Sequence, residues 1–232
     1  MISLLKRALP TTTKTWLKQH LMRAPDPAEA TTGAVSPDKQ DLDIYWTPEF
    51  AEMLEHWGEG NAWHEIRYLA APLNGRILDI ACGTGRVMEI LSNDLGKDVS
   101  GCDISEFLLT KAEERGIPRS RLFVEDATAM SFATGQFDYG YSIGSLEHFT
   151  ESGILDFVRE CARVVEKQTF HMIPVSRSDT DEGWIKTQQS FFNNSVTWWL
   201  ERYRSAYQEV KVLDSLWNDE ISVGKWFVCS KE

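Results

Sequence analysis

The chain has 232 residues, enough for one α/β domain with a large core and short appendages, and too few for two domains of average size. Hydrophobic residues make up 42% and charged residues 25% of the chain, which argues against a disordered or membrane-spanning protein. The net charge of −11 argues against a nucleic-acid partner, because such proteins usually present a basic face to the phosphate backbone.

Basic charge gathers in an N-terminal arm. Residues 1–23 carry five Lys or Arg and no acidic residue, whereas the rest of the chain carries 19 basic and 35 acidic residues. This arm fits three roles: peripheral contact with the inner membrane face, docking of a partner protein, or a solvated tail. Residues 24–40 are rich in Pro and few are large and apolar, which predicts a linker to a domain over residues 41–232.

Two features indicate a cytoplasmic protein. The apolar stretch at residues 2–5 is short and precedes the first charges, so we expect no secretory signal. The four cysteines form no Cys-x-x-Cys pair and lie in or beside apolar stretches, which predicts reduced, buried thiols. They are Cys82, Cys102, Cys161 and Cys229.

The predicted elements begin with two short helices, one capped by Thr47 ahead of Pro48 and one starting near Asn61. From Arg76, short apolar runs alternate with amphipathic stretches: RILDI, KDVSGCD, RLFVED, FDYGYSI and QTFHMIPV. Two later runs, EVKVLDSLW and SVGKWFVCSK, predict an antiparallel hairpin at the sheet edge. The expected fold class is therefore α/β: a Rossmann-like, doubly wound, seven-stranded sheet with an antiparallel C-terminal hairpin.

The turn DIACGTG lies between the first predicted strand and a helix. Gly83 and Gly85 would let a ligand approach the backbone closely, although an ordinary tight turn uses the same residues. Asp79 adds information, because a carboxylate ahead of the turn repels the phosphates of a dinucleotide. The same carboxylate suits the cationic amino and sulfonium groups of S-adenosylmethionine, so the residue types favour that cofactor.

Two more acids end the second and third predicted strands. Asp103 lies 18 residues after Gly85, where its carboxylate can accept hydrogen bonds from both hydroxyls of a ribose. The alternative is a turn-forming Asp ahead of the helix cap Ser105. Asp126 repeats the pattern after the third strand, so the three acids together predict a sulfonium-cofactor site rather than a generic nucleotide cleft.

At these residues the chain resembles the class I methyltransferases: LDIACGTGR resembles their first motif, CDIS the second, VEDATAMSF the third and FDYGYSIGSLEHF the fourth, as found in the small-molecule branch. The resemblance spans roughly residues 75–175, the expected cofactor-binding core. It implies that Asp79 lies near the methionine moiety, Asp103 holds the ribose and Asp126 contacts the adenine amino group. The predicted cofactor contacts also include Tyr45, Ala81, Gly83, Gly85, Ile104, Ala127 and Ser142.

Two of these contacts carry an alternative or a condition. Ala81 stands where many members of the family have Gly, and close approach of the cofactor there requires a negative φ. Tyr45 precedes the helix that we expect to cap the cleft, where packing is the alternative role for an aromatic side chain.

Methyl transfer is an in-line displacement, so orientation of the acceptor can supply much of the acceleration. For a hydroxyl acceptor we expect His148 to be the general base, with a structural histidine bonded to a backbone carbonyl as the alternative. Some quinone O-methyltransferases carry a metal-binding E-x-x-E-H cluster here. This chain has Gly144 at its first position, so we expect no bound metal, and we place His171 in the core.

The last predicted helix is rich in aromatic residues. Its spacing predicts that Trp199, Tyr203 and Tyr207 face the sheet. This leaves the following aromatic residues as candidates for an acceptor pocket: Trp184, Phe192 and Trp198.

We therefore expect S-adenosylmethionine-dependent methyl transfer, most simply to an oxygen of a small molecule or a saccharide-type acceptor. The segments NNSVTWWLERY, LDSLW and GKWFVC resemble bacterial methyltransferases associated with surface-polysaccharide assembly. Two alternatives stay open: a noncatalytic module that binds the cofactor and docks a partner enzyme, and an NAD-dependent oxidoreductase. The second would need phosphate contacts at the turn, and the sequence has no evident Tyr-x-x-x-Lys pair.

Overall fold

The computed structural model describes residues 40–186 and 189–231. The predicted arm at residues 1–23 lies outside the described residues, as does the linker apart from Gln40. Among the described helices, none is long and apolar enough to cross a membrane.

Three short helices precede the sheet: η1 (Asp43–Trp46), α2 (Pro48–Leu54) and α3 (Ala62–Ala70). The hydroxyl of Thr47 accepts a hydrogen bond from the backbone N–H of Phe50 at 3.3 Å, which satisfies one of the free donors at the start of α2. Asn61 caps α3 through its side chain. Both predicted helix starts are confirmed.

Seven strands form one sheet in the order β3-β2-β1-β4-β5-β9-β8. The pairs among β1 to β5 are parallel, and β9 pairs antiparallel with both β5 and β8. The predicted doubly wound sheet with a C-terminal hairpin is therefore confirmed. The strands are β1 (Ile77–Ile80), β2 (Val99–Asp103), β3 (Leu122–Val124), β4 (Phe137–Ile143), β5 (Val165–Ser176), β8 (Glu209–Asn218) and β9 (Ser222–Ser230).

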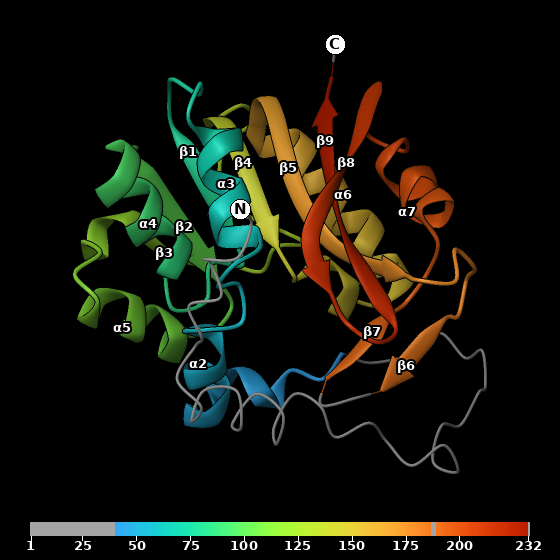
Figure 1. Cartoon of the computed structure of the whole chain (residues 1–232). Coiled ribbons are helices and arrows are strands. Elements are labelled where there is room, and N and C mark those ends of the chain that lie inside the picture. The colour runs from blue at the N-terminus through green and yellow to red at the C-terminus, as the bar shows by residue number, and fades with distance from the viewer. Residues whose placement is uncertain (1–39, 187–188, 232) are drawn as a thin grey trace, which may run out of the picture.

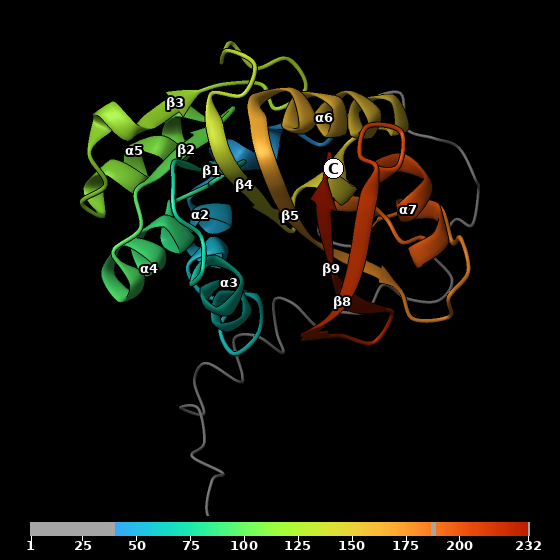
Figure 2. The ribbon, with the colours of Figure 1, turned by 90° about the horizontal axis from the view of Figure 1, so that it is seen from above.

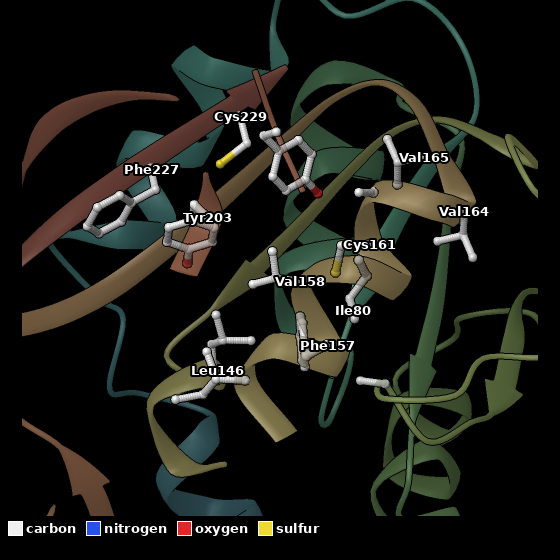
Figure 3. Close-up of a cluster of buried hydrophobic side chains, with 14 of the residues drawn as sticks. Ile80, Leu146, Phe157, Val158, Cys161, Val164, Val165, Tyr203, Phe227 and Cys229 are labelled. Carbon is white, nitrogen blue, oxygen red and sulfur yellow. The ribbon is translucent and has the colours of Figure 1, made fainter. Parts of the chain in front are cut away.

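Helices cover both faces of the sheet, with α6 and α7 on one side and α3 and α4 on the other (Figure 2). Each face has its own buried cluster, and Figure 3 shows the first, in which Phe157 and Cys161 lie near Tyr203, Phe227 and Cys229. All four cysteines are free and buried, as predicted. The helices after β1 are α4 (Arg86–Leu95), α5 (Glu106–Glu114), η2 (Arg119–Arg121), η3 (Leu146–His148), α6 (Glu151–Val164) and α7 (Val196–Tyr203).

A second, two-stranded sheet was not predicted from the sequence. It consists of β6 (Trp184–Lys186) and β7 (Ser190–Phe192), paired antiparallel. In Figure 1 it lies below the main sheet, beside the blue segment that leads into α2. In the main sheet, β1 and β4 are neighbours although β2 and β3 lie between them in the chain. The strand order therefore reverses between β1 and β4, and ligands of such folds bind at the carboxyl ends of the strands at this point.

Candidate active site

The glycine turn after β1 contains three residues with left-handed backbone. Gly83 has a φ of 54° and Gly85 a φ of 71°, and the two glycines face different neighbours. A Cβ on Gly83 would lie 2.9 Å from Cδ1 of Leu54, within the pocket described below, whereas a Cβ on Gly85 would lie 2.9 Å from Cβ of Ala112 in α5. Gly83 thus keeps the pocket open, and Gly85 permits close packing of the turn on α5.

Ala81 is the third left-handed residue, with a φ of 62°. The condition stated for close approach of the cofactor at Ala81, a negative φ, is therefore not met. A side chain in the left-handed region costs about 1 kcal/mol, because the Cβ crowds the backbone carbonyl. The turn adopts this conformation at Ala81 nevertheless, so Ala81 is a strained position directly after β1.

Asp79, in β1, is only 4% exposed and accepts a hydrogen bond from the Tyr141 hydroxyl at 2.8 Å. Burial raises the pKa of Asp79 to about 8, and the bond from Tyr141 opposes that rise only in part. The carboxyl is therefore largely protonated at neutral pH, and a cation placed beside it would favour its ionised form.

Asp103, at the end of β2, ties two backbone segments together. Its Oδ2 accepts the N–H of Gly83 at 2.9 Å, and its Oδ1 accepts the N–H of Ser105 at 2.9 Å. The turn-forming role considered for Asp103 is thus present in the structure. Each carboxylate oxygen has two lone pairs, so capacity for further hydrogen bonds is left on both. Burial raises the pKa of Asp103.

One cavity of about 300 Å³ lies at the carboxyl ends of β1, β2 and β4. It brings together most of the residues predicted for the cofactor, and His148 with them. From that prediction its lining includes Tyr45, Asp79, Ala81, Gly83, Asp103, Ile104, Asp126 and Ala127. Gly85 and Ser142 are absent from the lining.

Ser142 faces the other side of the sheet. Its Oγ lies 2.8 Å from Nδ1 of His171, and both residues are fully buried. Side chains alternate along a strand, so Tyr141 reaches Asp79, while its neighbour Ser142 bonds to His171, whose ring contacts Phe157 of α6 and Tyr203 of α7. The structure therefore gives no support to a side-chain contact of Ser142 with the cofactor, whereas the core position predicted for His171 is confirmed.

His148 ends η3 and lines the cavity. Its Nδ1 lies 2.8 Å from the backbone oxygen of Ser190, and since a carbonyl only accepts, Nδ1 carries the hydrogen. Burial lowers the pKa of His148 to about 4, so the ring is neutral and Nε2 holds a free lone pair. The carbonyl-bonded histidine considered as an alternative is present, and its geometry also leaves a nitrogen able to accept a proton.

Glu147 was not predicted as a site residue, yet its Oε1 lies 3.6 Å from Nε2 of His148. Burial raises the pKa of Glu147 to about 8, and its Oε2 has no partner among the described residues. Two neutral groups thus adjoin each other, of which His148 lines the cavity and Glu147 is buried behind it. The described residues contain no group of three or more His, Cys, Asp or Glu that could hold a metal ion.

Residues far apart in the sequence complete the cavity on the side of η1 and β7. The Tyr45 hydroxyl accepts a hydrogen bond from Nε2 of Gln189 at 2.7 Å, and its backbone oxygen accepts one from the Ser105 hydroxyl at 2.7 Å. Gln40 and Leu42 join Tyr45 in the lining. Sequence reasoning missed Gln40, Leu42 and Gln189, because no local pattern links residues that are about 150 positions apart.

The three aromatic residues proposed for an acceptor pocket are absent from the lining of the cavity described above. Trp184 and Trp198 each pack on Phe192, with ring centroids 4.9 and 5.1 Å apart, and these three residues adjoin the buried cluster below α7. Trp198 belongs to α7, whereas Trp184 and Phe192 belong to β6 and β7. The inward-facing positions of Trp199, Tyr203 and Tyr207 are confirmed by their burial. Aromatic residues that do line the cavity include Phe50, Trp57 and Phe149.

A doubly wound sheet, a glycine turn after β1, an acid in β1, one at the end of β2 and one just past β3 are the features expected from the resemblance to class I methyltransferases. In agreement, residues 77–168 match the family described as a methyltransferase domain. The match supports S-adenosylmethionine as the cofactor.

Two curated relatives carry methyltransferase names. The 2-methyl-6-phytyl-1,4-hydroquinone methyltransferase of Synechocystis sp. is 34% identical over 120 residues, which are 51% of this chain and 35% of that protein. A Bacillus subtilis protein is 28% identical over 56% of this chain and 53% of its own length. The chain thus spans about half or less of the length of these relatives.

A solved structure shares the fold. The 1,6-didemethyltoxoflavin-N1-methyltransferase of Burkholderia thailandensis, with bound 1,6-didemethyltoxoflavin and S-adenosylhomocysteine, has a TM-score of 0.64 and 15% identity. The likeness covers 82% of this chain and 85% of that one. At this identity it bears on the fold alone.

Proposed function

We propose that the protein transfers a methyl group from S-adenosylmethionine to an oxygen of an uncharged small molecule or saccharide-type acceptor. The observation that carries the proposal is the position of His148. Its neutral ring leaves Nε2 free to accept a proton in the same cavity that Asp79, Gly83 and Asp103 line.

The chemical groups of the lining suit the cofactor. Gly83 leaves backbone surface open to a ligand, and Asp79 places a buried carboxyl where a cationic amino or sulfonium group would stabilise its ionised form. Asp103 would hold the ribose through its remaining lone pairs. Asp126 would accept from the adenine amino group, with Ile104 and Ala127 as apolar walls beside the ring.

When bound, the cofactor supplies a methyl group on a cationic sulfur, and that sulfur keeps the bonding electron pair when the methyl group leaves. His148 accepts the hydroxyl proton of the acceptor at Nε2 as the oxygen takes the methyl group. The wall formed by Phe50, Trp57 and Phe149 would hold the acceptor and exclude water from the reacting atoms.

The charges of the lining support an uncharged acceptor. Among the described lining residues Arg86 is the one Lys or Arg, and it is engaged by Glu89 and stacks over the Trp63 ring at 5.6 Å. A phosphate or carboxylate close to the reacting oxygen would therefore meet several acids and no free cation. Aromatic walls suit both a phenolic ring, as in the hydroquinone named for the Synechocystis relative, and a sugar ring.

The test is methyl transfer from radiolabelled cofactor to a panel of three kinds of acceptor: hydroquinones, neutral glycosides and sugar phosphates. We expect turnover with one of the first two kinds and none with sugar phosphates, and a loss of about 100-fold or more in kcat for His148→Gln. Binding of S-adenosylhomocysteine without turnover on any probe would favour the noncatalytic module instead. Full activity of His148→Gln would remove His148 from the role of base.

The basic arm at residues 1–23 supports a second, peripheral role. Its mixture of basic and apolar residues suits contact with an anionic membrane surface or with a partner protein. Sedimentation with anionic liposomes should fall when residues 1–23 are deleted, while affinity for S-adenosylhomocysteine stays unchanged. Equal sedimentation of both forms would leave partner docking as the proposal.

A further inference from the structure

Ser190, the first residue of β7, uses all of its polar groups at the edge of the candidate site. Its N–H and its hydroxyl both donate to Oδ2 of Asp41, at 3.2 and 2.7 Å. Its backbone oxygen accepts the Nδ1 hydrogen of His148 at 2.8 Å. Ser190 is 5% exposed, so these bonds are largely shielded from water. One residue thus connects Asp41 to His148.

The bond to Ser190 decides which nitrogen of His148 is free. A neutral imidazole carries one hydrogen, and the nitrogen that holds it is set by the bond that the ring makes. Because the Ser190 oxygen can only accept, it holds the hydrogen at Nδ1 and leaves the lone pair at Nε2. A displacement of β7 would remove that constraint from the ring.

Asp41 belongs to the segment that we call the cover, residues 40–46. Three residues of the cover line the cavity: Gln40, Leu42 and Tyr45. The backbone oxygen of Tyr45 accepts a hydrogen bond from the hydroxyl of Ser105, two residues after Asp103. Figure 1 shows the cover as the blue chain between β7 and α2. The Ser190 hydroxyl lowers the pKa of Asp41, so its carboxylate is ionised and its bonds to Ser190 are charge-assisted.

We propose that Asp41 and Ser190 form a clasp that positions His148, so that the seating of the cover over the cavity and the choice of the proton-accepting nitrogen are set together. The proposal rests on the function proposed above, in which His148 is the base. Asp41 and Ser190 are positioning residues, since they act through His148. Lys186 lies beside the clasp, with its Nζ 3.7 Å from Oδ2 of Asp41.

The test uses the full chain labelled with ¹⁵N and compares Asp41→Asn and Ser190→Ala with the wild type. Asp43→Asn is the matched control, because Asp43 lies in the same segment and is exposed. Long-range ¹H–¹⁵N spectra report which ring nitrogen of each histidine carries hydrogen, and the signals lost in His148→Gln identify His148. We expect the Nδ1–H form in the wild type and in Asp43→Asn, and a several-fold larger share of the Nε2–H form in both clasp variants.

Wild-type ring spectra in Asp41→Asn and Ser190→Ala would overturn the clasp. Thermal unfolding and binding of S-adenosylhomocysteine, measured on the same samples, show that each variant is folded. The two proposals also fail separately. A wild type that methylates no probe, or a fully active His148→Gln, removes the proposed function. The spectra still decide whether Asp41 and Ser190 set the protonated nitrogen of His148.

Discussion

Tyr141 donates its hydroxyl hydrogen to Oδ2 of Asp79 over 2.8 Å, and both side chains are buried below the glycine turn. The donor is neutral, so it stabilises a carboxylate less than a cation would. Burial therefore dominates and raises the pKa of Asp79 to about 8. The free protein holds a protonated acid where the proposed ligand carries positive charge, and binding should thus be coupled to proton release.

The first prediction concerns this coupling. Between about pH 6 and 7 Asp79 is mostly protonated in the free protein, and a bound cation favours its ionised form, so the affinity for S-adenosylmethionine should rise with pH. Isothermal titration in two buffers of different ionisation enthalpy should show release of up to one proton per ligand. Asp79→Asn should bind more weakly and release none. Equal proton release by the wild type and Asp79→Asn would contradict the assignment.

A second prediction follows for the stability of the free protein. The pKa of Asp79 is raised from 3.8 to about 8 on folding, so its contribution is fully present below about pH 4 and is lost as pH rises through 8. Asp79→Asn avoids the buried charge and should stabilise the free protein at pH 7.5 by about 1 to 3 kcal/mol. Urea unfolding at pH 4 and 7.5 checks this, with the exposed Asp43→Asn as the control. No gain at pH 7.5 would count against a raised pKa.

Ala81 gives the third prediction. Its φ of 62° is a conformation in which glycine is not strained, so Ala81→Gly should raise the free energy of unfolding by about 1 kcal/mol. Ala127 also lines the cavity and is not among the described residues with positive φ. Ala127→Gly should therefore lower the free energy of unfolding, because glycine loses more backbone entropy on folding. Thermal unfolding of both variants distinguishes strain relief from a general effect of glycine.

Much of the fold follows from local patterns. The apolar runs that contain Asp79 and Asp103 form parallel strands, as predicted, and both acids line one cavity at the carboxyl ends of these strands. No local pattern predicts the strained backbone of Ala81, because alanine normally adopts a negative φ. Alternation along a strand does predict that Ser142 and its neighbour Tyr141 face opposite sides of the sheet, so the two residues cannot both point into the cavity.

The rest of the site depends on contacts between distant segments. Asp41 contacts Ser190 across 149 positions of the chain, and Tyr45 contacts Gln189 across 144. The strands β6 and β7 have three residues each, which is too short for a clear periodic pattern. Helical spacing correctly predicted that Trp199 is buried, but it does not predict where α7 lies relative to the cavity.

The fourth prediction concerns Trp198, which is absent from the lining of the cavity. Its ring packs on Phe192 and lies 3.5 Å from the guanidinium carbon of Arg202, outside the cavity. Trp198→Ala should cost about 1 to 3 kcal/mol of stability and leave binding of S-adenosylhomocysteine unchanged. Trp57→Ala is the comparison, because its ring lines the cavity, and it should weaken binding. If Trp198→Ala and not Trp57→Ala loses most of its affinity for S-adenosylhomocysteine, α7 contributes to the site.

The last prediction separates backbone strain from ligand access at the glycine turn. Gly83 and Gly96 have similar φ values, 54° and 61°, so alanine at either position should cost about 1 kcal/mol of stability. A Cβ on Gly83 would lie 2.9 Å from Leu54 Cδ1 in the cavity, whereas one on Gly96 would meet no atom within 4 Å. Gly83→Ala should therefore raise the Kd for S-adenosylhomocysteine about tenfold or more, a loss of about 1.4 kcal/mol. Gly96→Ala should leave that Kd unchanged while lowering the Tm by a similar amount. If titration finds the same Kd for both variants, the turn acts through stability alone and Gly83 is not a ligand contact.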